Sequence, residues 1–260
     1  MNDQESVNDL YIKKDTLSIR ANLHEKYSVN KYGWSNWVFD QYHIEENYRV
    51  LEFGCGTGNF WKEKETLLPN DIEITLIDIS PLMIEKAKEK LGSNKKFTFQ
   101  IMDIQNVLFP DNCFDIIIAN HMLYHVPDID KALSEVKRVL KTDGFFYTTT
   151  IGRNNLMQLE MIYRIFNDII QFNYSGGLSF ILENGKGILS KYFGKIDLKQ
   201  YEDSLKVTNI DDLMNYIISY NNIPKEIFQE IYQIIKKEID SNGEMKIVKD
   251  AGMFIAKPLV

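Results

Sequence analysis

The sequence predicts an α/β fold of the Rossmann-like, doubly wound kind, with a seven-stranded sheet that is mostly parallel and has an antiparallel last strand. Apolar strand-like runs alternate with helical segments from residue 49 to residue 150, and this order is typical of parallel strands joined by helical crossovers. The first run, RVLEF, leads directly into the glycine turn GCGTG. The fourth run, CFDIIIAN, is apolar throughout its centre, which indicates a strand buried on both faces.

The elements follow in chain order from a helical N-terminal extension. Residues 1–46 form this predicted extension, with helices expected over residues 10–23 and 34–42. The core of the sheet is expected over residues 47–151, with strands at residues 49–53, 73–78, 96–103, 113–120 and 144–150. A helix is expected after the glycine turn at residues 59–67. Ser80 and Pro81 suit the start of the next helix, as N-cap and first-turn residue.

The pattern changes after residue 151. We expect an inserted helical cap over residues 152–193, opening with the helical stretch NLMQLEMIYRIFNDIIQF and continuing through a glycine-containing region. Residues 194–260 then complete the core sheet. Two strands are expected there, at residues 194–201 and 252–257, separated by helices near residues 210–219 and 224–239.

Composition excludes several classes of protein. The 260 residues are 44% hydrophobic and 26% charged, close to ordinary globular proteins, so neither a disordered nor a fibrous chain is indicated. No apolar run approaches the roughly 20 residues that span a bilayer, and the first 20 residues lack the apolar centre of a signal peptide. A cytoplasmic location without a membrane partner is expected. The net charge of −7 without a basic tract disfavours nucleic acid as a partner.

The two cysteines, Cys55 and Cys113, lack the paired spacing of a zinc site or a disulfide framework. We expect no metal, and two free thiols.

The glycine turn carries most of the functional information. Glu52 lies at a strand end and is followed by glycines at positions 54, 56 and 58. Glycine permits a sharp turn and a close approach of the backbone to a ligand, and ligands of doubly wound sheets bind at the carboxyl ends of the strands. A plain tight turn between strand and helix is the alternative. The spacing also departs from the GxGxxG fingerprint of nicotinamide enzymes, since residue 59 is Asn.

Two further acids are expected at strand ends. Asp78 ends the second predicted strand, 20 residues beyond Gly58, where a carboxylate can accept hydrogen bonds from ribose hydroxyls. Asp103 ends the third and can accept from an adenine amino group. A helix-capping role for Asp78 and a solvated loop position for Asp103 are the alternatives. Three acids at successive strand ends nevertheless favour one shared nucleoside ligand.

Several segments together resemble the class I S-adenosylmethionine-dependent methyltransferases, particularly the bacterial type 11 and type 25 groups. They are VLEFGCGTG, LIDIS, the pair Met102-Asp103, and FDIIIANHMLYHVPDIDKALSEVKRVLKTDG, and the similarity spans roughly residues 48–150. The resemblance implies S-adenosyl-L-methionine as cofactor and S-adenosyl-L-homocysteine as product. It places the cofactor's methionine part at Glu52 and the backbone of Gly54 and Gly56, its ribose at Asp78, its adenine at Asp103 and Ile104, and its sulfonium beside Asn120 and His121. Cys55, Gly58, Ile79 and Met83 complete the expected cofactor-binding set.

Methyl transfer is an in-line displacement, so the protein mainly aligns the nucleophile and excludes water. Where the acceptor must lose a proton, His121 and His125 are the candidate bases, although His125 fits a structural role better. The N-terminal aromatic residues Tyr27, Tyr32, Trp34 and Trp37 are candidates to close over the site, and Arg20 or Lys31 to reach the cofactor carboxylate. Packing is the alternative role for the aromatic residues.

The expected function is methyl transfer to an O, N or C nucleophile of a small molecule. The acidic charge and the inserted cap favour a small acceptor. Methylation of a protein or nucleic acid is the nearest alternative, although Asn120-His121-Met122-Leu123 lacks the Asn/Asp-Pro-Pro-aromatic tetrad associated with amino and amide methylation. A non-catalytic S-adenosylmethionine-binding protein and a nicotinamide oxidoreductase are the others. The acceptor atom and the oligomeric state do not follow from the sequence.

Overall fold

The computed structural model describes residues 16–166, 177–220 and 224–258. In it, a single sheet of seven strands has the order β3-β2-β1-β4-β5-β7-β6. The strands are β1 (Arg49–Phe53), β2 (Glu73–Asp78), β3 (Phe97–Ile101), β4 (Phe114–Asn120), β5 (Leu140–Ile151), β6 (Phe193–Val207) and β7 (Met245–Pro258). Strands β1 to β5 pair in parallel, whereas β7 is antiparallel to both β5 and β6. The predicted fold class, with its antiparallel last strand, is confirmed.

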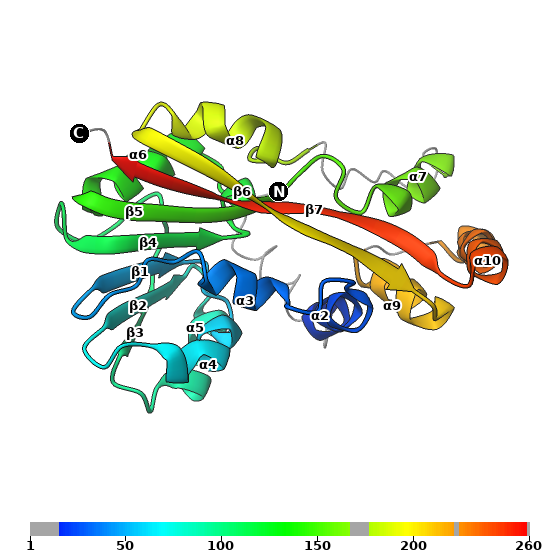
Figure 1. The fold of residues 1–260 in the computed structure, drawn as a ribbon, viewed down its shortest axis with the longest axis horizontal. Coiled ribbons are helices and arrows are strands. Elements are labelled where there is room, and N and C mark those ends of the chain that lie inside the picture. Colours follow the sequence, from blue (N-terminus) through cyan, green and yellow to red (C-terminus); the bar gives the residue numbers. More distant parts are fainter. Residues whose placement is uncertain (1–15, 167–176, 221–223, 259–260) are drawn as a thin grey trace.

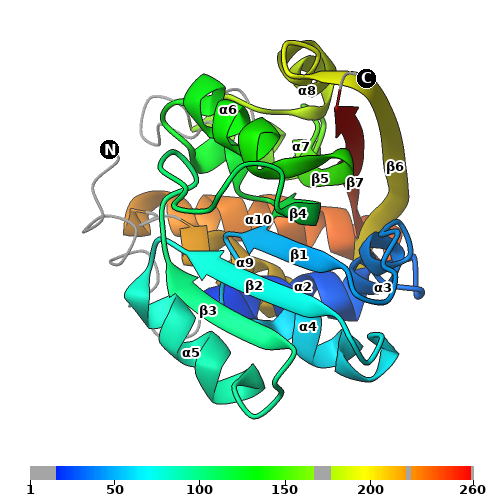
Figure 2. The same cartoon turned by 90° about the vertical axis from the view of Figure 1, so that its left-hand side faces the viewer.

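Helices cover both faces of this sheet (Figure 2). One face carries α6 (Ile129–Val139) and α8 (Leu182–Leu189), and the other carries α3 (Trp34–Phe39), α4 (Asn59–Lys64) and α5 (Pro81–Leu91). Short 3-10 turns, η1 (Glu65–Leu67) and η2 (Leu123–His125), follow α4 and β4. Alternate residues of the central strands enter the two cores. In β4, for example, Ile117 packs on the α6 face and Ile116 and Ile118 on the α4 face. The strand is therefore apolar throughout.

The last two strands are much longer than the sequence predicts. Figure 1 shows β6 and β7 running past the ends of the other strands to the helices α9 (Ile210–Tyr220) and α10 (Lys225–Asn242). A third core lies there, formed by α2 (Thr16–Tyr27), α7 (Met157–Ile165), α9, α10 and the far ends of β6 and β7. We call this assembly the cap. It is built from three separated stretches of the chain.

The predicted inserted cap over residues 152–193 is therefore not one unit. Its first helix, α7, belongs to the cap, but α8 packs with Phe180 and Phe254 on the central sheet. The glycine-containing region includes α8 itself, where Gly185 lies so close to the sheet that a Cβ would come within 2.4 Å of the Phe254 ring. Glycine here permits close packing of helix on sheet. Residues 167–172 of the predicted cap helix lie outside the described residues, as do residues 10–15 of the first predicted helix.

Two smaller expectations also change. The third strand ends at Ile101, two residues before Asp103. Helix α5 begins after Ser80 as predicted, but the Ser80 side chain makes no capping hydrogen bond. Within the three described ranges, no helix combines the length and apolar character needed to cross a membrane.

Candidate cofactor and acceptor site

The glycine turn joins β1 to α4 at the carboxyl edge of the sheet. Gly54, Gly56 and Gly58 have φ angles of 70°, 55° and 73°, in the left-handed region that a side chain disfavours. A Cβ on Gly54 would also come within 3.0 Å of Met122. The N–H of Cys55 donates to the Ile77 carbonyl at 3.0 Å, which ties the turn to β2. Burial raises the pKa of the Cys55 thiol, so this side chain stays protonated.

Asp78, at the end of β2, lies directly beside this turn. Its carboxylate accepts hydrogen bonds from the N–H of Gly56 at 3.0 Å and from the N–H of Ser80 at 2.9 Å. Burial raises the pKa of Asp78, and the backbone donors oppose that rise. A carboxylate oxygen accepts more than one hydrogen bond, so Asp78 keeps acceptor capacity for a ligand such as a ribose. The capping alternative accounts for one of its two backbone contacts.

Glu52 is a buried carboxylate, 3% exposed. It accepts from the indole N–H of Trp61 at 2.5 Å and from the amide of Asn120 at 3.4 Å. Burial raises its pKa from 4.5 to about 7 despite these donors, and the nearby Asp78 adds to the rise. A cation bound at this turn would favour the ionised form.

Asn120, at the end of β4, fits a ligand-binding role. Its amide nitrogen donates to the hydroxyl of Tyr42 at 2.7 Å and more weakly to Glu52. Its Oδ1 is buried without a hydrogen-bond partner. Because buried polar atoms are nearly always hydrogen-bonded in folded proteins, an orphan acceptor beside a buried carboxylate suits the ammonium or hydroxyl groups of S-adenosylmethionine. The residues present therefore fit this cofactor.

The residues expected at the adenine and beside it differ in their exposure to solvent. Asp103 is half-buried in the turn after β3, and Gln105 donates to its carboxylate from both backbone and side chain. Ile104 and Met83 are buried, at 4% and 2% exposed, so they support the site from beneath its surface. Ile79 is 42% exposed next to Asp78 and presents an apolar surface at the strand tips.

His121 occupies a strained position just past β4. Its φ is 49°, and its N–H is held by the Thr149 carbonyl at 3.1 Å and the Thr149 hydroxyl at 3.0 Å. Burial, with the charge of Lys249, lowers its pKa to about 4, so the imidazole is neutral at physiological pH. Left-handed non-glycine residues cluster at functional sites. His125 is exposed and packs against Tyr124 at 4.5 Å between ring centroids, in keeping with the structural alternative.

The structure does not bring Arg20 and Tyr27 to the glycine turn. Arg20 donates to the side chain of Ser219 at 3.1 Å, and the Tyr27 hydroxyl donates to Asp212 at 2.6 Å. Both side chains thus bind α9 within the cap. The partners of both residues lie on another cap helix, so the structure gives no support to the expectation that they bind the cofactor.

Trp34 and Trp37 do approach the strand tips. The Trp34 ring lies 5.2 Å from the rings of both His121 and Tyr201, and Trp37 stacks on Trp34 at 5.3 Å. Tyr42 and Trp61, which orient Asn120 and Glu52, were not identified from the sequence. An aromatic residue in a helix shows no sequence signal that separates a hydrogen-bond donor from an ordinary core residue.

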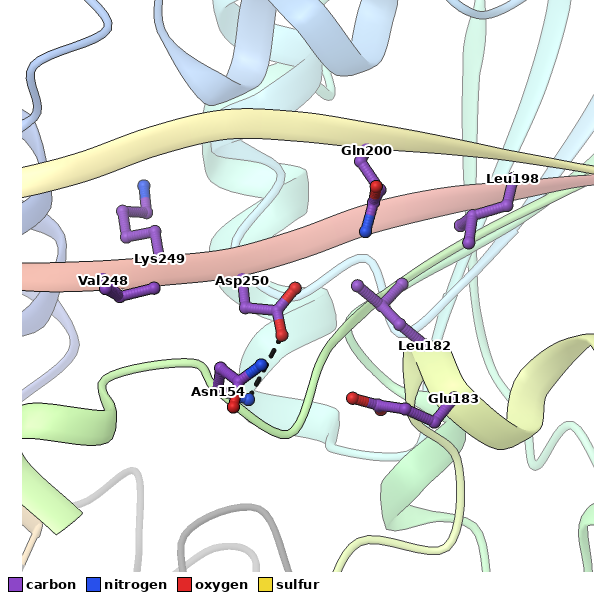
Figure 3. A pocket seen from close by; sticks show the side chains of 8 residues that line it. All are labelled: Asn154, Leu182, Glu183, Leu198, Gln200, Val248, Lys249 and Asp250. Atoms are coloured by element: carbon purple, nitrogen blue, oxygen red, sulfur yellow. Dashed lines mark hydrogen bonds between the residues drawn. The ribbon is translucent and has the colours of Figure 1, made fainter. Parts of the chain in front are cut away.

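A hollow of about 440 Å³ lies beside the β6–β7 ribbon, next to Asn154 and the start of α8. Asp250, Gln200 and Leu198 line it together with Asn154 and the start of α8. Figure 3 shows the Lys249 side chain projecting away from Asp250 and Asn154, as strand alternation requires. Lys249 is also one of the residues that line this hollow, although its side chain projects from the ribbon on the side opposite Asp250 (Figure 3).

A seven-stranded sheet in this order, with a glycine turn between a buried acid and a second acid at the next strand tip, defines the class I methyltransferase fold. Residues 51–148 match the family described as methyltransferase domain. The fold and this match together support a class I S-adenosylmethionine-dependent methyltransferase domain in this part of the chain.

The curated relatives are similar over limited parts of the chain. A malonyl-[acyl-carrier protein] O-methyltransferase of Legionella pneumophila is 30% identical over 48% of this chain and 44% of its own length. A second malonyl-[acyl-carrier protein] O-methyltransferase, from Ilyobacter polytropus, is 33% identical over 45% of this chain. The chain thus spans less than half the length of these two relatives, 44% and 42%. A ubiquinone/menaquinone biosynthesis C-methyltransferase of Pasteurella multocida is 27% identical over 72% of this chain and 70% of the relative.

Solved structures share the fold at lower identity. The YcgJ protein of Bacillus subtilis aligns with a TM-score of 0.58 at 19% identity, covering 87% of this chain and 98% of its own. Phosphoethanolamine N-methyltransferase 2 of Haemonchus contortus, solved with S-adenosyl-L-methionine, aligns with a TM-score of 0.59 at 17% identity, covering 96% of this chain and 60% of that chain.

Proposed function

We propose that this protein transfers the methyl group of S-adenosyl-L-methionine to a small-molecule acceptor at the carboxyl edge of the sheet. The observation that carries the proposal is the glycine turn, whose three left-handed glycines lie between the buried Glu52 and the Asp78 carboxylate that binds Gly56. A Cβ on Gly54 or Gly58 would meet Met122 or Leu91, whereas the space beside Gly56 is open, so the backbone at Gly56 is accessible to a ligand. Both flanking acids then face that ligand.

We assign each part of the cofactor to residues with unused polar capacity. Glu52 and the orphan Oδ1 of Asn120 would hold the methionine portion, and Asp78 the ribose. Ile79 and the Asp103 turn would bound the adenine. When bound, the cofactor supplies a methyl group already activated by positive sulfur.

The protein's own contribution is alignment and dehydration. Trp34 lies against His121, just past β4, and Trp37 stacks on Trp34, which would keep water from the reacting atoms. His121, held neutral by burial, is able to accept a proton from a hydroxyl acceptor. We assign it the role of base where the acceptor needs one, and His125 a structural role.

The small-molecule acceptor is supported by the relative whose name describes C-methylation in ubiquinone/menaquinone biosynthesis. The two malonyl-[acyl-carrier protein] O-methyltransferases are named for a small acyl group that is attached to a protein. The chain's charge of −7 also argues against a phosphate backbone as substrate. A cytoplasmic location is part of the same proposal, and cell fractionation with immunodetection tests it.

Two measurements test the proposal. Titration calorimetry with S-adenosyl-L-methionine, S-adenosyl-L-homocysteine and NADH should show binding of the first two ligands alone. Incubation with methyl-labelled cofactor and a metabolite extract should then transfer label into the small-molecule fraction. Label in the nucleic-acid fraction, or label in the protein fraction that alkaline hydrolysis of thioesters and esters does not release, would favour the macromolecular alternative. Binding without transfer to any fraction would favour a non-catalytic binder.

A further inference from the structure

A second group of polar residues lies where the cap meets the strand tips. It comprises His24 of α2, Trp34, His121, Tyr201 and Asp203 of β6, and Lys249 of β7, and we call it the seam cluster. Trp34 contacts His121 and Tyr201, and the Lys249 ammonium lies 5.5 Å from the centre of the Tyr201 ring. Since His121 follows Asn120 in the chain, the cluster adjoins the proposed cofactor site.

Of the two charged groups in the cluster, Asp203 has all its hydrogen-bond partners and Lys249 does not. Asp203, with a fully buried side chain, accepts from Lys249 at 2.8 Å and from the Ser28 hydroxyl at 2.7 Å. It also accepts from the N–H groups of Asn30 and Ser204, at 3.0 and 2.8 Å. These donors hold the pKa of Asp203 below its usual range despite its burial. The carboxylate is therefore saturated with donors.

Lys249 is in the opposite condition. Its side chain is 11% exposed, and among the described residues its ammonium donates one hydrogen bond, to Asp203. An ammonium has three N–H donors, so two remain for a ligand. A buried cation with unused donors is expensive unless a partner completes its coordination.

The negative charge paired with Lys249 is that of Asp203, and two histidines also lie near the ammonium. Burial and then the Lys249 charge lower the pKa of His24 to about 4, and the same causes act on His121. Both imidazoles are therefore neutral, so Lys249 is the positively charged group of the cluster. Because the Asp203 carboxylate is already saturated with donors, the unused N–H groups of Lys249 favour a further acceptor oxygen, most strongly an anionic one.

Unpartnered polar atoms gather at the same place. Across the described parts of the chain, His24 Nδ1 and Asn120 Oδ1 are buried polar atoms without a hydrogen-bond partner, and Tyr201 Oη has only the weak contacts with Ser28 and the Gly33 backbone that lower its pKa. His24 and Tyr201 belong to the seam cluster, and Asn120 adjoins it. Because such atoms are rare in folded proteins, their concentration in one region indicates a ligand site. His121 and Trp34 are half-buried, so the cluster has access to solvent.

We propose that the seam cluster is the acceptor site and that it selects an acceptor bearing an anionic oxygen, a carboxylate or an ionised hydroxyl, which Lys249 binds with its unused donors. Trp34 and Tyr201 pack against the apolar part of that acceptor. This inference rests on the proposed methyltransferase function and adds the charge class of its substrate. Acceptors with a fixed ammonium group are excluded from the site.

The test uses the full chain saturated with S-adenosyl-L-homocysteine. Four probes share a phenyl ring and differ in charge: 4-hydroxybenzoate, 4-nitrophenol above neutral pH, phenol and tyramine. Their dissociation constants are measured at millimolar concentrations by ligand-observed NMR. At least one anionic probe should bind about tenfold or more tightly than tyramine, the scale of a charge-assisted hydrogen bond, and the better anion distinguishes carboxylate from hydroxyl. Equal affinities, tighter binding of tyramine, or no binding of either anion would overturn the proposal.

Lys249→Met should remove the preference for the anion, whereas Lys246→Met, an exposed lysine on the same strand, should keep it. Because Lys249→Met leaves Asp203 buried without its cation, the double variant Lys249→Met with Asp203→Asn removes both charges together and should also lose the preference. A preference retained in either folded variant contradicts the role of Lys249.

Affinity for S-adenosyl-L-homocysteine separates the two proposals. Absence of this affinity in the unmodified protein refutes the methyltransferase function, whereas its presence without a preference for the anionic probes refutes the seam assignment alone.

Discussion

Replacing Glu52 with Gln should change the pH dependence of stability in a defined way. The carboxylate is 3% exposed, and burial raises its pKa from 4.5 to about 7. The folded state therefore binds a proton more tightly than the unfolded state. The stability contributed by this proton is fully present below pH 4.5 and is lost as the pH rises through about 7.

The pKa difference corresponds to about 3 kcal/mol of unfolding free energy lost at high pH. Glutamine stays neutral, so Glu52→Gln avoids that loss. Its side chain has one acceptor oxygen for the donors of Trp61 and Asn120, and leaving one of them unmatched costs about 1 kcal/mol. The variant should thus be about 2 kcal/mol more stable than the unmodified protein near pH 8 and about 1 kcal/mol less stable near pH 4.

Urea unfolding of the cofactor-free protein, followed by circular dichroism across this pH range, measures the difference. Glu89→Gln, an exposed glutamate on α5, is the matched control and should show no comparable crossover. A difference between Glu52→Gln and the unmodified protein that stays constant with pH would refute the reasoning, because it would mean that Glu52 is ionised throughout.

Three further outcomes are expected. Asp78→Ala should weaken binding of S-adenosyl-L-homocysteine by about 1–3 kcal/mol, measured by calorimetry, while the exposed Asp71→Ala leaves it unchanged; equal affinities would remove Asp78 from the site. His121→Ala should lower the rate of methyl transfer more than cofactor affinity, and equal losses would assign the residue to binding. Gly58→Ala, at φ 73°, should lower the free energy of unfolding by about 1–2 kcal/mol. Gly187→Ala, in a helix with open space around it, should raise it by about 0.5–1 kcal/mol. If thermal unfolding ranks the two variants in the reverse order, the backbone argument is contradicted.

The parallel part of the sheet was predictable because its signals are local. The runs at residues 49–53 and 73–78 are strands with the predicted bounds, since an unbroken apolar run flanked by a turn has few other ways to be buried. The glycine turn also follows from its own residues. The ends of strands were predicted less accurately. Asp103 lies two residues beyond the end of β3, because hydrophobic periodicity does not mark the point at which a solvent-exposed strand stops.

The cap was not predictable in its composition. Helix α2 lies far from α9 in the sequence, yet Arg20 and Tyr27 bind it, and no periodicity within either helix reveals the other as its partner. The same holds for β6 and β7, whose extra length is used to carry the cap. Their polar residues there, Asp203 and Lys249, resemble ordinary surface charges in the sequence.

The sequence by itself determined the alternating core, the left-handed glycine turn and the acids near its strand ends, because each depends on residues close together in the chain. The tertiary structure alone decided which side chains orient Glu52 and Asn120, and that Lys249 lies beside two neutral histidines. Those arrangements depend on desolvation and on contacts between distant segments, and both exist only after the chain has packed.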